Sequence, residues 1–215
     1  MAHKLEIQLT FQLKSPVHIT GERAELYIDK ALLLDAQAQY PLIPATTIKG
    51  WLRESSERHL RGWGVQVCDG SKANLMCGHC LVCQLFGAPQ HRALLRFSDA
   101  VLRDGVRDVR MNVSLSRFRR ASFEERLFST ELAWASGFSC QLDGILPDVE
   151  RARQAAALIY VAARMGFALG AARSRGLGWV CLDQFQANCD GQILAIQDLL
   201  AYLPTMIRAL QGTSA

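Results

Sequence analysis

The first segment of the chain alternates apolar and polar residues, which is the pattern of a strand with one buried face. Its apolar positions are Leu5, Ile7, Leu9, Phe11 and Leu13. Pro16 follows, and because proline lacks an amide hydrogen we expect the strand to end or bend there. Apolar and small residues then recur at helical spacing over residues 47–61, which predicts an amphipathic helix after Pro44, capped by a threonine pair.

The rest of the pattern predicts a mixed fold with several further strands. Residues 17–39 are irregular and polar, as in a long loop or an irregular hairpin. The later segments are strands at 93–102, 138–142 and 179–187, a long hairpin at 107–130, and helices at 149–169 and 198–210. This order predicts one α+β domain over residues 1–215, with a modified ferredoxin-like or RNA-recognition-motif sheet. Residues 64–92 form an insertion in that sheet, and the hairpin projects from it.

Composition is that of a folded protein, with 50% hydrophobic and 20% charged residues. The formal net charge of +4 is modest, so any phosphate-binding character must come from local clusters. The most membrane-like segment, residues 155–172, contains Arg164 and is therefore predicted to be a buried helix rather than a membrane span. The amino terminus lacks the apolar run of a secretion signal, and with seven cysteines this indicates a reducing, cytoplasmic location.

Four cysteines have the spacing of a metal site: Cys68, Cys77, Cys80 and Cys83. Four thiolates close in sequence can surround one tetrahedral zinc ion, and with no open position that ion would be structural. The last three cysteines also match part of an iron–sulfur motif, although its downstream cysteine and proline are missing. The spacing favours zinc, and the alternatives are His79 in place of one cysteine as a ligand, or four free thiols.

Two arginine clusters are candidate phosphate contacts. The loop at residues 169–180 combines glycines with Arg173 and Arg175, which suits a phosphate, but a glycine-terminated helix with two solvated arginines has the same sequence. The hairpin tip carries arginines among aromatic residues, as a single-stranded RNA contact requires: Arg117, Phe118, Arg119, Arg120, Phe123 and Arg126. Neighbouring glutamates could equally balance these charges in an exposed hairpin. Lys49 and Arg53 lie four apart, on one helix face.

Taken in order, five segments resemble the RAMP superfamily of CRISPR proteins, and more narrowly the backbone subunit of type III (Csm or Cmr) effector complexes. The segments are SPVHITG, YIDKALLLDAQAQYPLIPATTIKGWLR, CGHCLVCQLFG, RLFSTELAWASGF and LGAARSRGLGWV. The resemblance implies that the chain binds guide RNA and single-stranded target RNA, and assembles with other effector subunits, including further copies or paralogues of itself. It makes the hairpin a thumb that interrupts pairing between the two RNAs. It also implies guide contacts at His18, Lys49, Arg53, Arg173, Ser174 and Arg175.

The same resemblance implies that Asp29 cleaves the target RNA. A carboxylate there could hold Mg²⁺ or another divalent ion, or help to activate a ribose 2′-hydroxyl. Asp35 is the second candidate, and the competing interpretation is that Asp29 is one loop acid among several. The chain departs from the family pattern at 45–47, where Ala-Thr-Thr replaces glycine-serine-serine, and at 171–172, where two alanines replace a glycine-containing pair. A non-catalytic RNA-binding subunit and a small iron–sulfur redox protein are the rival functions.

Overall fold

A computed structural model describes residues 2–23 and 25–212 of the chain. For Glu125 it describes the backbone only. The ends of the predicted domain, Met1 and residues 213–215, lie outside the described residues, as does Ala24. The body is an antiparallel sheet in the order β3-β7-β1-β8-β9. Its strands are β1 (His3–Leu13), β3 (Leu95–Phe97), β7 (Gly137–Leu146), β8 (Val180–Cys189) and β9 (Gln192–Ile193).

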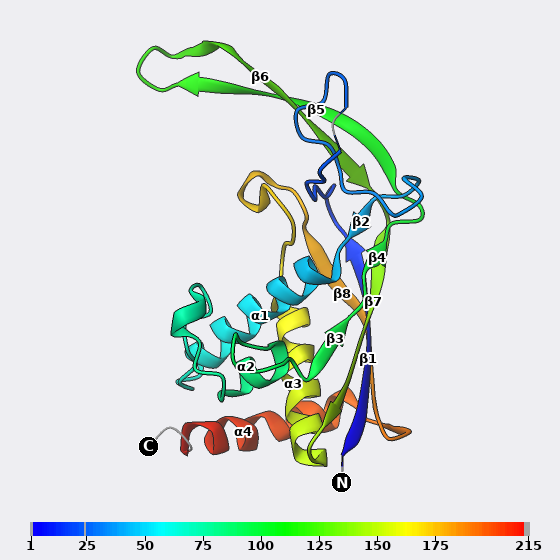
Figure 1. The fold of residues 1–215 in the computed structure, drawn as a ribbon, viewed down its shortest axis with the longest axis vertical. Coiled ribbons are helices and arrows are strands. Elements are labelled where there is room, and N and C mark those ends of the chain that lie inside the picture. The colour runs from blue at the N-terminus through cyan, green and yellow to red at the C-terminus, as the bar shows by residue number, and fades with distance from the viewer. Residues whose placement is uncertain (1, 24, 213–215) are drawn as a thin grey trace.

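The alternation of β1 produces the core, as predicted. Its apolar residues Leu5, Ile7, Leu9 and Phe11 are at most 2% exposed. They face the layer of α1 (Ala45–Gly62) and α3 (Val149–Met165), which cover one face of the sheet, while α4 (Ile196–Gly212) packs on α3 near the chain ends (Figure 1). Polar side chains occupy the opposite face of the sheet, so the helices bury one face only.

Helix α3 ends four residues before the predicted end at residue 169. The chain leaves the helix at Gly166, which has extended backbone angles although its amide still reaches the carbonyl of Ala162. The indole of Trp51 packs so closely on Gly166 that a Cβ atom there would overlap it. Helix α3 therefore ends where the Trp51 side chain of α1 packs against it, and residues 167–178 form a loop.

The segment predicted as one strand at 93–102 is divided between two sheets. Strand β3 pairs with β7, whereas β4 (Ala100–Val101) pairs with β2 (Leu42–Ile43). Asp99 lies at the break, where its Oδ1 accepts a hydrogen bond of 2.7 Å from the amide of Ala45. This carboxylate accepts a hydrogen bond from one of the backbone amides that have no partner within the first turn of α1. The threonine pair expected to cap the helix lies within α1 instead.

The predicted hairpin is confirmed as β5 (Val106–Ser116) and β6 (Ala121–Trp134), which project away from the body as an arm (Figure 1). We call this arm the thumb. Its base is held by bridges from Val17 to Ala133 and from Lys30 to Thr130, so the irregular segment 17–39 packs against it. The start of β1 and helix α4 lie at the opposite end of the molecule (Figure 1).

The cysteine insertion contains two short helices, η1 (Ala73–Leu75) and α2 (Leu81–Phe86), and a third short helix, η2 (Arg173–Arg175), lies in the glycine-arginine loop. The predicted α+β class is confirmed, with an antiparallel sheet, a cysteine cluster and a projecting hairpin. Among the described residues, no helix combines the length and apolar character needed to span a membrane.

Candidate nucleic-acid interface and metal centre

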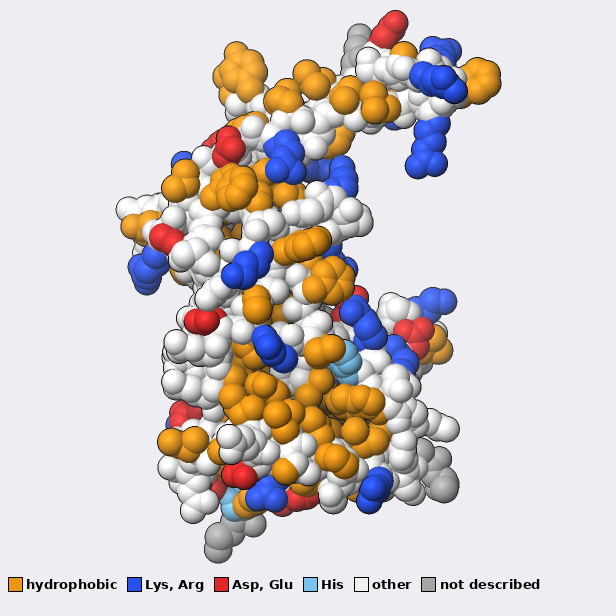
Figure 2. Space-filling view, turned by 180° about the vertical axis from the view of Figure 1, so that it is seen from behind, with side chains coloured by type: hydrophobic (Ala, Val, Ile, Leu, Met, Phe, Trp, Pro, Cys, Tyr) orange, Lys and Arg blue, Asp and Glu red, His pale blue; other side chains and the backbone are white. Residues whose placement is uncertain are grey.

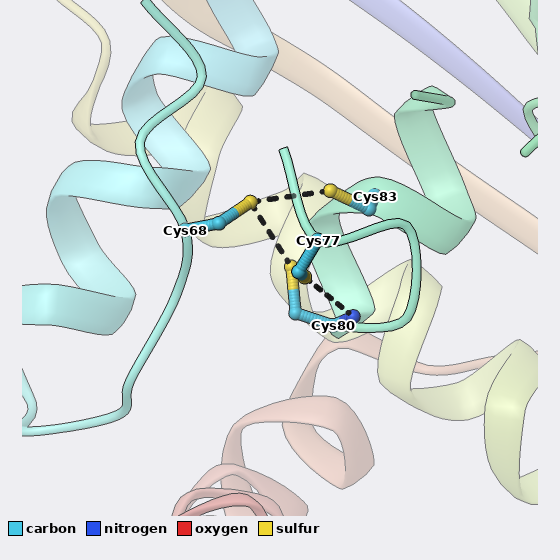
Figure 3. Close-up of side chains that lie close together, drawn as sticks. All are labelled: Cys68, Cys77, Cys80 and Cys83. Carbon is cyan, nitrogen blue, oxygen red and sulfur yellow. Dashed lines mark hydrogen bonds between the residues drawn. The ribbon is translucent and has the colours of Figure 1, made fainter. Parts of the chain in front are cut away.

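The four predicted cysteine ligands converge in the structure. Cys68 comes from the segment after α1, Cys80 precedes α2, and Cys83 lies within it (Figure 3). All four sulfur atoms lie within 4.8 Å of one another. The Sγ atom of Cys68 is 3.2 Å from that of Cys83 and 3.8 Å from that of Cys80. Zinc–sulfur bonds of about 2.3 Å in a tetrahedron place the sulfurs about 3.8 Å apart, so the cluster fits such an ion.

The surroundings of these thiols also suit a metal. Cys83 is fully buried, and burial is the main reason that the pKa of Cys80 rises to about 12. Cys77 is exposed and Cys68 and Cys80 are half-buried, so the cluster runs from the surface to the buried Cys83, and a divalent ion would deprotonate all four groups. The alternative ligand His79 is exposed, and its Nδ1 hydrogen-bonds the carbonyl of Cys77 at 2.8 Å. The cysteines alone therefore supply a complete set of four ligands.

A second candidate site is a small cleft of about 70 Å³ at the base of the thumb. Three parts of the chain line it: the thumb strands β5 and β6, the segment that follows β1, and the glycine-arginine loop. Its charged lining residues are all cationic: Lys30, Arg110 and Arg175. Asn112 and Phe128 add an amide and an aromatic ring, and the Lys30 ammonium lies 5.4 Å from the centre of that ring. The cleft therefore favours an anion beside a flat apolar group.

His18 forms part of this cleft but is 2% exposed. Its Nδ1 lies 2.7 Å from the carbonyl oxygen of Glu131, and its Nε2 lies 2.9 Å from the hydroxyl of Thr20. A carbonyl only accepts, so Nδ1 carries the hydrogen and Nε2 accepts from Thr20. Burial lowers the pKa of His18, which keeps the ring neutral. His18 thus fixes the walls of the cleft and is not a mobile proton donor.

Asp29 lies on the loop beside this cleft and is anchored to β6 by Ser129. Its Oδ2 accepts hydrogen bonds of 2.7 Å from the Ser129 amide and 3.0 Å from the Ser129 hydroxyl. The hydrogen bond from the Ser129 amide is the main cause that lowers the pKa of Asp29, so the exposed carboxylate is ionised at neutral pH. Within the described part of the chain, Oδ1 accepts no hydrogen bond. Asp29 is thus held by one oxygen and presents the other.

Asp35, the second catalytic candidate, has a local role. Its Oδ1 accepts hydrogen bonds from the amides of Gln39 and Tyr40, at 2.8 and 3.1 Å. A carboxylate bonded in this way closes its own turn. The structure therefore separates the two acids, because of these two only Asp29 is hydrogen-bonded to the thumb.

Glu131 is a central residue of this region that the sequence pattern does not reveal. Although 3% exposed, its Oε2 accepts hydrogen bonds of 2.9 Å from Arg23 and from the amide of Leu32, and its Oε1 is 3.5 Å from Arg107. The carboxylate therefore joins the loop that carries Asp29 to both thumb strands. Its alternating position in β6 contains no signal for this, since its partners Arg23 and Leu32 lie 108 and 99 residues away in the sequence.

The glycine-arginine loop is held against the same region. The amide of Ala171 bonds the carbonyl of His18, and the amide of Gly178 bonds that of Pro16. Arg175 reaches the cleft, while Arg173 pairs with Glu54 of α1 at 3.1 Å, and Ser174 is exposed. The loop therefore lies between the cleft and α1 instead of extending freely into solvent.

The remaining predicted residues are distributed over two other places. Arg117, Arg119 and Arg120 are exposed at the thumb tip, away from the cleft, and Figure 2 shows basic side chains gathered there. On α1, Lys49 is half-buried, and Arg53 is turned toward the cysteine insertion. The structure thus groups His18, Arg175 and the Asp29 loop, and keeps the tip and the metal cluster separate.

A larger cavity, of about 930 Å³, lies beside the β9–α4 connection and contains none of the predicted site residues. Side chains such as Gln8, Gln141 and Gln186 line it next to the β9–α4 connection. It combines amides with charges of both signs and has no cationic bias. The smaller cleft is therefore the candidate nucleic-acid surface.

Comparison with known proteins agrees with this architecture. One solved structure with a similar fold is a chain of "Cryo-EM structure of the Type III-B Cmr-beta bound to cognate target RNA", with a TM-score of 0.60 and 16% identity. The match covers 86% of this chain but only 60% of that one. No protein in a search of curated proteins matches significantly. The family model of the RAMP superfamily matches residues 10–181, most of the sequence, and the chain therefore belongs to the RAMP superfamily.

Proposed function

We propose that this protein is an RNA-binding backbone subunit of a type III CRISPR effector complex. The observation that carries the proposal is the RAMP fold with a cationic cleft at the base of its thumb. The solved structure of similar fold belongs to a type III-B complex bound to target RNA. The partners we propose are guide RNA, target RNA and other effector subunits, including copies or paralogues of this chain. The proposed location is the cytoplasm.

The cleft supports RNA binding through its charge. Lys30, Arg110 and Arg175 can neutralise a backbone phosphate, and the Phe128 ring beside them can pack on a base or sugar. At the tip, Arg117, Arg119 and Arg120 surround Phe118, which is 98% exposed and free to stack on a base. We propose that the guide lies along the cleft and the α1 side of the loop, where it contacts Lys49, Arg173 and Ser174. A direct contact between Arg53 and the guide RNA stays a prediction.

We further propose that Asp29 makes this subunit an endoribonuclease acting on the paired target. Its lowered pKa makes it a weak proton acceptor, which favours a role in holding a divalent cation over abstracting the 2′-hydroxyl proton. Mg²⁺ prefers one or two carboxylates plus substrate phosphate oxygens. When bound, such an ion would stabilise charge at the scissile phosphate. Ser129 would keep Oδ1 directed outward for that purpose.

Asp29→Ala in the assembled complex tests this proposal, with labelled complementary RNA and Mg²⁺. We expect cutting at regular spacing to disappear while RNA binding is retained. Asp35→Ala is the matched control, because it removes a loop carboxylate of local structural role, and it should retain cutting. Persistent cutting by Asp29→Ala would favour the second candidate function, a backbone subunit that binds RNA without cleaving it.

We propose that Cys68, Cys77, Cys80 and Cys83 bind one structural zinc ion. The sulfur geometry supports this, and four protein ligands leave no position for substrate. A metal assay on purified protein should give about one zinc per chain without visible colour. A coloured, iron-containing preparation would instead establish the iron–sulfur alternative.

A further inference from the structure

Three charged residues of α1 form a ladder that faces the cysteine insertion. Arg53, Glu57 and Arg61 are spaced four residues apart, and Glu57 accepts from both arginines, at 2.9 and 3.2 Å. The side chains of Arg53 and Glu57 are only 15% and 10% exposed. A solvated helix face would leave such a pair open to water, so its burial requires further partners.

These partners lie at both ends of the insertion. Arg53 Nη1 donates to the carbonyl of Gly87 at 2.7 Å, and Arg61 Nη2 donates to the carbonyl of Cys68 at 2.7 Å. Between them, Gly70 lies directly on the ladder, and a Cβ atom there would overlap the Glu57 carboxylate. The ladder therefore bonds the insertion at two backbone carbonyls and contacts it at Gly70, and of these three positions only Gly87 lies outside the cysteine segment 68–83.

The third donor of Arg53 reaches the metal cluster itself. Its Nη2 lies 3.9 Å from the Sγ atom of Cys83, the fully buried member of the cluster. Four thiolates around one divalent cation carry a net charge of −2, and a buried anion needs a nearby cation. A guanidinium stays charged and offers several donors in one plane, so it can bond the carboxylate, the carbonyl and the sulfur together.

We propose that Arg53 is the outer-shell partner of the cysteine metal centre, donating a hydrogen bond to the Cys83 thiolate and balancing the cluster's charge. Glu57 positions the guanidinium for this role. The inference rests on the proposed zinc site and extends it, because it links metal binding to the helix that also carries Lys49. It also gives Arg53 a role within the protein, as a positioning residue.

Competition between the intact protein and a chromogenic zinc chelator tests this inference. Outer-shell substitutions typically weaken metal binding by about 10–100-fold, and we expect that range for Arg53→Gln and Arg53→Lys. Lysine keeps the charge and the aliphatic stem but cannot reproduce the three-way fork. Arg58→Gln is the matched control, since Arg58 lies on the exposed face of α1 and pairs with Glu54. Its zinc affinity should change by less than about twofold.

Cobalt substitution gives a second readout that does not depend on RNA or activity. Loss of a hydrogen bond to one thiolate should shift the thiolate-to-cobalt charge-transfer band in Arg53→Gln but not in Arg58→Gln. If Arg53→Gln does not fold, the affinity and spectrum of Arg53→Lys decide. A wild-type protein without metal would contradict the zinc site itself. Zinc binding by Arg53→Lys within about twofold of wild type, with an unshifted band, would overturn the role of Arg53 alone.

Discussion

Replacing Glu131 by alanine should be the most destabilising single change at the thumb base. The substitution removes the acceptor for the Leu32 amide and one of the two carboxylates that pair with Arg23, which keeps only Glu25 at 2.6 Å among the described residues. Breaking a buried pair by removing one partner costs about 3–5 kcal/mol. Arg23 and Arg107 keep 29% and 41% of their side-chain exposure, so we expect the lower value, about 3 kcal/mol.

Thermal unfolding followed by circular dichroism measures this effect. For a chain of this size, about 3 kcal/mol lowers the melting temperature by about 6–12 °C. Glu6→Ala is the matched control, because Glu6 pairs with Lys4 in solvent and should change the free energy of unfolding by less than about 0.5 kcal/mol. If the two variants melt at the same temperature, Glu131 does not join the loop to the thumb as argued.

Three further predictions concern the RNA surface and its loops. Gly178→Ala should weaken guide RNA binding in anisotropy titrations by at least about tenfold, since residue 178 has φ +69° and an added Cβ atom would overlap a backbone oxygen. In the control Gly176→Ala, at φ +82°, the added Cβ atom would lie in open space and the backbone strain should cost only about 1–2 kcal/mol. Phe118→Ala should leave the melting temperature unchanged and weaken RNA binding by about 1–3 kcal/mol, and unchanged binding would refute stacking. The folded-state pKa of Asp29 is lowered, so its hydrogen bonding to Ser129 should be complete above pH 3.8 and be lost only as the pH falls through that lowered pKa. Ser129→Ala removes the hydroxyl donor and should raise the pKa of Asp29 in carboxyl NMR titrations. An unchanged titration midpoint would contradict the assignment.

The elements that the sequence predicts well are those whose signal is local. Alternation alone identifies β1 and both thumb strands, and the cysteine spacing identifies the four clustered thiols. The end of α3 could not be predicted, because it depends on the contact of Gly166 with Trp51 of another helix. The division of residues 93–102 likewise depends on Asp99 reaching the first turn of α1.

The site shows the same limit. Resemblance to a family position identifies Asp29, but its anchoring by Ser129 comes from a residue 100 positions away. The resemblance to the family predicts that Arg53 contacts the guide RNA. In the structure its donors reach Glu57 and the insertion, partners that helical periodicity cannot distinguish from solvent or a ligand.

The alternating pattern of the thumb restricts how its length can change. One face of the arm carries Val109, Met111 and Val113, each at least 44% exposed, and the other carries Arg110 and Asn112 toward the cleft. Deleting a single residue at the base of one strand would exchange these faces beyond it, pointing the aliphatic chains at the cleft and the arginine away. Only changes by two residues preserve both faces. Thumbs of related chains should therefore differ in steps of two residues per strand, or compensate an odd step with a bulge. This hairpin has a register shift between Val113 and Leu115.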